Sequence, residues 1–100
     1  MLFFGLSRPD GSFISDADFD SFIETEITPR FPDGFTVLRG DGHWREGAKE
    51  YREPSRILWI IHNDEPELDV KIEQIRSGYC QQFHQTSVLR MDQPAAKILY

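Results

Sequence analysis

Hydrophobic and polar positions along the chain follow two spacings, which separate predicted strands from predicted helices. Four short, mainly apolar runs between turn-forming residues predict β-strands, at residues 2–6, 35–38, 56–62 and 87–91. Apolar residues recur at helical spacing in two further segments, which predict amphipathic helices over about 15–28 and 63–84. The resulting order is strand, helix, strand, strand, helix, strand, as in a ferredoxin-like α+β fold. Such a fold has a four-stranded antiparallel sheet with two helices on one face, and residues 95–100 are expected to add a short fifth strand or an extended tail.

The ends of the predicted helices carry their own signals. Ser15 begins a capping-box-like sequence, and Pro29 is expected to end the first helix. Asn63 or Asp64 is expected to cap the second helix, with Pro66 in its first turn.

The composition of the strands predicts their order in the sheet. Residues 2–6 and 57–61 are continuously apolar, as expected for central strands, whereas two glycines and several charged residues weaken or bulge the strand that begins at residue 35. Five successive apolar residues at 57–61 indicate that both faces of that strand are covered. Both helices should lie on one face, so we expect a second subunit to cover the open face of the sheet in a homodimer. In the alternative, the C-terminal tail folds over that face.

Length and charge restrict the class of protein. One hundred residues, 39% of them hydrophobic, predict a single globular domain over 1–100. A net charge of −6 argues against partners such as nucleic acids or anionic membranes. The chain has no apolar run long enough to span a membrane and no secretory signal, and a lone cysteine, Cys80, excludes an internal disulfide. These features predict a cytoplasmic protein.

Polar residues concentrate between Arg30 and Arg56, around a hairpin that is predicted to turn near residues 47–49. In this hairpin Asp41 should lie near Arg56, and Arg45 near Arg52 and Glu53. The candidate ligand-binding residues are Arg30, His43, Trp44, Arg45, Arg52, Glu53 and Arg56.

Two interpretations of this cluster are open. In the first, it is a pocket for an anion or carboxylate, in which Arg30, Arg52 and Arg56 donate hydrogen bonds, His43 is an acid or base and Trp44 forms a flat wall. In the second, it is a ladder of cross-strand ion pairs, each worth about 0.2–1 kcal/mol. The pattern narrowly favours the ladder.

The sequence predicts no metal site and no cofactor. The three histidines lack the spacing of metal ligands, and no cysteine cluster is present. No glycine-rich loop has the spacing of a phosphate-binding loop, and no residue is assigned as catalytic.

The segment Thr-Pro-Arg-Phe-Pro-Asp-Gly at residues 28–34 is the most distinctive part of the chain, because its two prolines fix two φ angles and remove two backbone donors. With Trp44-Arg45 and Arg52-Glu53-Pro54-Ser55, it resembles a bacterial family of small domains of unknown function. The resemblance spans nearly the whole chain and implies a self-contained domain, but it brings no activity, substrate or catalytic residue. It also suggests that residues 28–34, 44–45 and 52–55 act together as one functional or structural unit.

Two functions are therefore expected. The chain binds a small anionic ligand beside the hairpin, or it is a non-catalytic protein–protein interaction module that docks through its charged hairpin and edge strand. A concave pocket with His43 beside unpaired arginines would favour the first function, and a hairpin whose arginines are all paired would favour the second.

Overall fold

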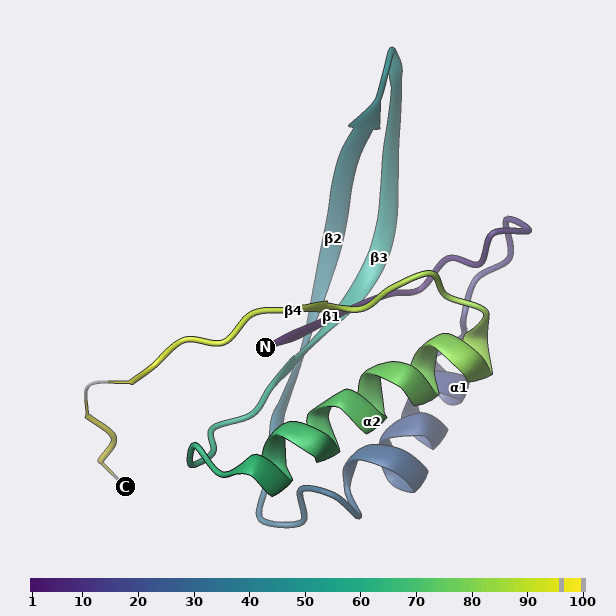
Figure 1. Ribbon diagram of the computed structural model, residues 1–100. Helices are drawn as coiled ribbons and strands as arrows, with labels where there is room; N and C mark the ends of the chain where they lie inside the picture. Colours follow the sequence, from purple (N-terminus) through teal and green to yellow (C-terminus); the bar gives the residue numbers. More distant parts are fainter. Residues whose placement is uncertain (96, 100) are drawn as a thin grey trace.

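In the computed structural model, which describes residues 1–95 and 97–99, an antiparallel sheet packs against two helices (Figure 1). The strands are β1 (Leu2–Gly5), β2 (Thr36–Glu46), β3 (Lys49–Trp59) and β4 (Leu89–Arg90), in the order β2-β3-β1-β4. The helical elements are α1 (Asp16–Phe22), its π-helical continuation η1 (Ile23–Ile27), and α2 (Pro66–Phe83). The prediction of an α+β fold with a four-stranded antiparallel sheet is confirmed, as is the central position of β1 and β3.

The first helix begins and ends as its sequence predicts. The Ser15 side chain accepts a hydrogen bond from the backbone N–H of Asp18 at 3.1 Å, which satisfies a free donor of the first turn. The last turns widen into η1, where the N–H of Thr28 donates to the carbonyl oxygen of Ile23 at 2.9 Å. Pro29 follows directly and cannot continue the helix.

The second helix also begins at the predicted proline, but its predicted cap is wrong. Pro66 is the first residue of α2, and Glu65 occupies the cap position without a side-chain hydrogen bond. Asn63 and Asp64 lie further upstream, outside the cap position. At the other end His84 adopts a left-handed conformation with φ of 54°, which stops the helix where the sequence predicts.

The hairpin is much longer than predicted. Strands β2 and β3 have eleven residues each and pair without interruption from Thr36↔Trp59 to Glu46↔Lys49, so Gly40 and Gly42 neither break nor bulge β2. The turn consists of two residues, and Gly47 there has a φ of 60° that favours glycine. Strand β1 pairs with β3 only from Ser55 onward. Residues 42–53 therefore leave the sheet as a two-stranded extension, the hairpin arm, which projects from the body in Figure 1.

The C-terminal region is less regular than predicted. Strand β4 has two residues instead of five, and Ala95 and residues 97–99 are not in a strand. The rest of the expected fifth strand, residues 96 and 100, lies outside the described residues. The described part of this tail runs away from the sheet in Figure 1, so it does not fold over the open face.

The core lies between the sheet and the helices and is rich in aromatic rings. Phe4 of β1 contacts Phe19, Phe22 and Tyr79 edge-on, with ring centroids 4.7–6.2 Å apart. Alternation along β1 and β3 sends Leu2, Phe4 and Leu58 into this core, and sends Phe3 and Ile57 to the opposite face. No described helix covers that opposite face, which we call the open face.

Candidate functional site

The seven candidate residues do not form one site. The structure divides them into four groups: Arg30 lies beside α2, Arg56 points to the helical face of the sheet, Arg45 and Arg52 lie on that face of the hairpin, and His43, Trp44 and Glu53 line a hollow where the hairpin arm leaves the sheet.

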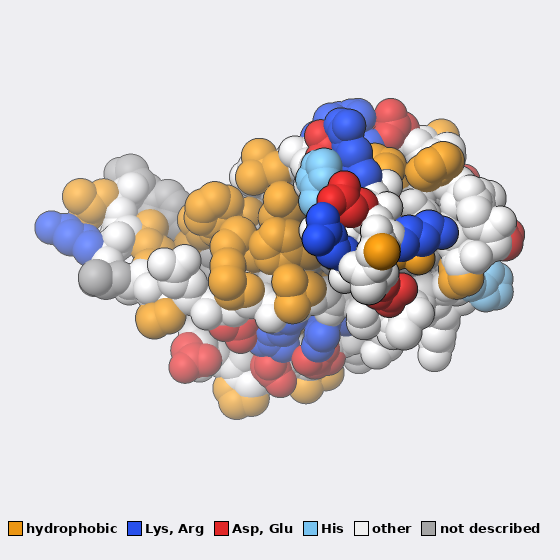
Figure 2. All heavy atoms as spheres, turned by 90° about the horizontal axis from the view of Figure 1, so that it is seen from above, with side chains coloured by type: hydrophobic (Ala, Val, Ile, Leu, Met, Phe, Trp, Pro, Cys, Tyr) orange, Lys and Arg blue, Asp and Glu red, His pale blue; other side chains and the backbone are white. Residues whose placement is uncertain are grey.

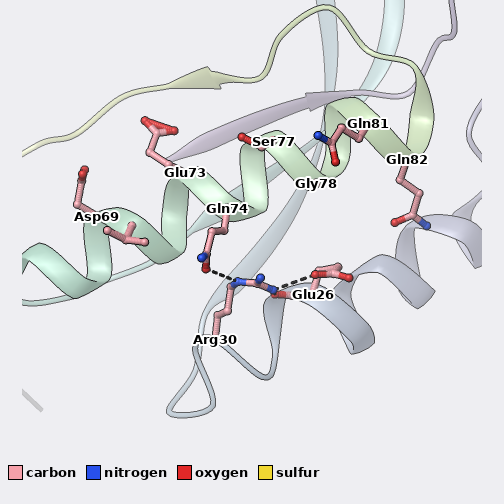
Figure 3. A pocket seen from close by; sticks show the side chains of 10 residues that line it. Glu26, Arg30, Asp69, Glu73, Gln74, Ser77, Gly78, Gln81 and Gln82 are labelled. Atoms are coloured by element: carbon pink, nitrogen blue, oxygen red, sulfur yellow. Dashed lines mark hydrogen bonds and ion pairs between the residues drawn. The ribbon is translucent and has the colours of Figure 1, made fainter.

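Arg30 lies in a groove between η1 and α2, on the helical side of the molecule (Figure 3). Its Nη1 donates to Glu26 Oε2 at 2.9 Å, and its Nε donates to Gln74 Oε1 at 3.2 Å. The groove has a volume of about 760 Å³, and all of its lining residues except Val70 and Gly78 have polar side chains. The prediction that Arg30 lies beside the charged residues of the second strand is wrong. Phe31, which is buried, fixes the proline segment against the core and leaves Arg30 on the outside, next to α2.

Arg56 is also displaced from the predicted pocket, because strand alternation points it to the helical face. Its side chain is 8% exposed and forms an ion pair with Asp16 at the start of α1. Its expected neighbour, Asp41, instead lies opposite Pro54 and is 3.6 Å from Arg52. Arg52 and Arg56 both flank Pro54 on the same face, so each is a diagonal neighbour of Asp41, and Asp41 pairs with Arg52 whereas Arg56 pairs with Asp16.

The hairpin carries two cross-strand ion pairs on its helical face, Arg45–Glu50 and Arg52–Asp41. Arg45 Nη2 is 2.5 Å from Glu50 Oε1, and His43 lies directly opposite Arg52. Arg45 lies opposite Glu50 in the register, so Arg52 is its diagonal neighbour on the same face, as expected. The expected proximity of Arg45 to Glu53 is wrong, since Glu53 points to the opposite face. All four arginines between residues 39 and 56 have a carboxylate partner within 4 Å, although Arg39 and Arg56 pair with Asp16 of α1 and not across the hairpin.

One end of the arm carries a stack of aromatic rings and an ammonium group. The rings of Trp44 and Tyr51 are parallel within 6°, with centroids 5.1 Å apart. The Nζ atom of Lys49 lies 4.9 Å from the centroid of Tyr51, in cation–π geometry. The indole of Trp44 is 44% exposed.

A smaller hollow of about 280 Å³ lies where the hairpin arm leaves the sheet. Glu53 and Trp44 line it on one side, and Gly5 and Gly42 are part of it. The remaining lining residues are Phe3, Phe4, His43, Ser55, Gln85, Ser87 and Leu89. No arginine lines the hollow, so its charge does not suit the anionic ligand that the sequence suggests.

Glu53 lies low over the sheet because its neighbours are glycines. A Cβ atom on Gly5 would be 2.5 Å from Glu53 Oε1, so only glycine leaves room for the carboxylate. The backbone N–H of Ser7 donates to Glu53 Oε2 at 3.1 Å and fixes the side chain. Sequence reasoning missed Gly5 and Ser7, although the glycines at alternate positions 40 and 42 were a signal that one face of β2 lacks side chains at two successive positions.

The open face carries an apolar patch beside this hollow. Phe3 pairs with Ile57 and Leu89, and Leu38 pairs with Ile57, so these side chains point to one face. Trp59, Leu89 and Met91 are 48%, 64% and 45% exposed. The open-face patch comprises Phe3, Leu38, Ile57, Trp59, Leu89 and Met91. Figure 2, which views the molecule from the side opposite the helices, shows hydrophobic side chains gathered between the charged arm and the C-terminal tail.

Groups with shifted pKa values lie outside the hollow. Burial raises the pKa of the Tyr79 phenol above its usual range, and the negative charge of Glu53 raises it further. Hydrogen bonds from Arg90 lower the pKa of Asp92, and hydrogen bonds from Ser12 lower that of Asp10. Among the described residues, no three histidine, cysteine or acidic side chains are arranged to hold a metal ion.

Comparison with known proteins identifies one family. The profile of a family described as "Protein of unknown function (DUF3574)" matches residues 1–98. No curated protein and no solved structure is similar to the chain. In the described part of the chain, no helix combines the length and apolar character needed to cross a membrane.

Proposed function

We propose that this chain, which belongs to the DUF3574 family of proteins of unknown function, is a non-catalytic interaction module that forms a homodimer through its open-face patch. The observation that carries the proposal is the set of large apolar side chains on a sheet face without a covering layer. Monomeric proteins rarely expose contiguous apolar patches larger than a few hundred Å². The two arginines of the hairpin arm, Arg45 and Arg52, both have carboxylate partners, which further supports an interaction role over an anion pocket.

The distribution of charge favours a second copy as the partner. Acidic residues are concentrated on the helical side, including Asp18, Asp20 and Glu24 of the first helix and Glu67 and Asp69 of α2. The open-face patch itself contains no charged residue. Two chains that meet through this patch about a two-fold axis would bury apolar surface and keep their acidic helices on the outside. A basic partner would instead be attracted to the helices.

We further infer a ferredoxin-like topology, a single domain over residues 1–100 and a cytoplasmic location. The topology is supported by the element order, together with β1 and β3 at the centre and β2 and β4 at the edges. The location is supported by the net charge of −6 and by the free thiol of Cys80, which suits a reducing compartment.

The mass of the chain in solution tests the homodimer. Light scattering after size-exclusion chromatography at micromolar concentrations should give twice the 11.7 kDa of one chain. Trp59→Arg should shift the mass towards a single chain, because it places a charge within the open-face patch that the proposed dimer buries. Val70→Arg is the matched control, since Val70 is 54% exposed but lies on α2. A single-chain mass for the wild type, or equal effects of the two variants, would contradict the proposal.

A further inference from the structure

We propose that the hollow beside the hairpin arm binds a primary ammonium group on a small apolar body, with Glu53 as the anionic anchor and Trp44 as the wall. The inference goes beyond the homodimer and stands on the residues of one chain.

The hollow exists because the floor of the sheet lacks side chains at three positions. Gly5, Gly40 and Gly42 all lie on the open face, where each pairs with β3. A Cβ atom on Gly40 would lie 3.0 Å from Ser55 Oγ, and one on Gly42 would lie 3.6 Å from the carbonyl oxygen of Glu53. These missing side chains leave space above the strands and bring Glu53 and Ser55 to its floor.

The carboxylate of Glu53 is held in place but has an oxygen available. The N–H of Ser7 donates to Oε2 at 3.1 Å. Within the described part of the chain, Oε1 accepts no hydrogen bond. The side chain is half-buried, so a charge-assisted hydrogen bond to Oε1 would form in a partly dehydrated place. Ser55 adds a hydroxyl group at the same floor.

The aromatic stack supplies the second half of the site. Tyr51 stacks on the Trp44 indole, and its own ring already holds the Lys49 ammonium group 4.9 Å from the ring centroid. Trp44 lines the hollow together with Glu53. An ammonium group in the hollow therefore meets an indole wall and a carboxylate, which is the arrangement that proteins use to bind organic cations.

Charge and shape define the class of ligand. Glu53 is the only acidic or basic lining residue apart from His43. Arg52 and Arg45 point to the other face of the arm by strand alternation, where they pair with Asp41 and Glu50. Phe3 and Leu89 form an apolar end of the hollow. A volume of about 280 Å³ suits a small molecule, just below the roughly 300–1,000 Å³ of common ligand pockets.

The hollow adjoins the open-face patch, since Phe3 and Leu89 belong to both. A second copy on the patch would close the hollow from above, so the ligand would lie at the rim of the dimer. The lining residues come from one chain, and binding is therefore expected in the Trp59→Arg variant as well as in the wild type.

Nuclear magnetic resonance of the full chain tests the site with phenethylammonium, 2-phenylethanol and 3-phenylpropionate, which differ in charge but share a ring. Phenethylammonium should shift the amide signals of Gly42 and Glu53 and the indole N–H signal of Trp44. The alcohol and the carboxylate should bind at least about tenfold more weakly, as expected for the loss of a charge-assisted hydrogen bond. Equal binding of the three probes would overturn the proposal, as would the absence of any shift with phenethylammonium up to about 10 mM.

Matched variants assign the binding to the hollow. Glu53→Gln should weaken phenethylammonium at least about tenfold, because it removes the charge but keeps an acceptor for Ser7. Glu50→Gln, which also removes one carboxylate from the arm, should change binding less than about twofold. Gly42→Ala should also weaken phenethylammonium binding, because its methyl group fills part of the floor of the hollow. It replaces Glu53→Gln as the test if Glu53→Gln does not fold. Unchanged binding in the variant that folds would overturn the site. Phenethylammonium binding should persist in a monomeric Trp59→Arg variant, so the test of the ligand site is independent of the test of the homodimer.

Discussion

The phenol of Tyr79 donates a hydrogen bond to the backbone carbonyl oxygen of Gly5, with 2.6 Å between the two oxygens. This bond joins α2 to the central strand directly beneath the hollow, at the glycine over which Glu53 lies. The ring of Tyr79 is buried in the aromatic core, so one residue connects core packing to the position of the candidate site.

Removal of this hydroxyl group should lower stability. Tyr79→Phe keeps the ring contacts but leaves the Gly5 carbonyl oxygen without its donor, and we expect a loss of about 1 kcal/mol in the free energy of unfolding. Tyr51→Phe removes a hydroxyl group from the hairpin arm and should change stability by less than about 0.5 kcal/mol. Urea denaturation measures both values. Equal effects would show that the bond to Gly5 contributes nothing to stability.

Alkaline pH should destabilise the protein through the same residue. Burial raises the folded-state pKa of Tyr79 above its usual range, whereas the unfolded chain ionises near pH 10. Its contribution is present below pH 10 and is lost as the pH rises further, because the unfolded state then releases more protons than the folded state. Thermal melts between pH 8 and about 11 should show a smaller decline in Tyr79→Phe than in the wild type. Parallel declines would contradict this assignment.

Two alanine substitutions at glycines of the open face should have opposite effects. Gly5→Ala places a methyl group 2.5 Å from Glu53 Oε1, so the carboxylate must move and lose the Ser7 N–H. We expect a loss of about 1–3 kcal/mol. At Gly42 a Cβ atom meets its nearest neighbour at 3.6 Å, and alanine should be neutral or stabilise the strand by up to about 1 kcal/mol. Chemical denaturation distinguishes them, and equal losses would mean that both positions require glycine for another reason.

Local signals in the sequence predicted the ends of the helices well, but they predicted the lengths of the strands poorly. Ser15, Pro29 and Pro66 mark helix ends through their own hydrogen bonds or fixed φ angles, so their effects depend little on the rest of the chain. The two glycines of β2 were misleading as strand-weakening residues. Their backbone groups pair with β3 like those of any other residue. The absence of their side chains instead leaves space on the open face beside Ser55 and Glu53.

The candidate site was less predictable because it depends on register and on tertiary packing. Three of the candidate residues, His43, Trp44 and Glu53, line the hollow, but Arg56 lies on the opposite face. A hairpin turn of two residues decides which side chains meet, and the sequence was consistent with more than one turn. Arg30 lies beside α2 because Phe31 is buried in the core, which no pattern within residues 28–34 indicates.

The ion pair between Arg56 and Asp16 should stabilise the fold, although Arg56 was a candidate ligand-binding residue in the sequence. Its guanidinium group is nearly buried and pairs with Asp16, whereas Asp18, in the same first turn of α1, has no described ion pair. Asp16→Asn should therefore cost about 1–2 kcal/mol more than Asp18→Asn, since both remove one charge near the helix start but only the first leaves a buried cation without its partner. In 1 M salt the Debye length is about 3 Å, so interactions between exposed charges are largely screened. Because Arg56 is shielded from solvent, much of the difference in stability between the two variants should persist in 1 M salt. Equal losses of stability in urea denaturation, or a difference that disappears in salt, would contradict this prediction. Either result would show that the Arg56–Asp16 pair contributes no more than the exposed ion pairs of the hairpin.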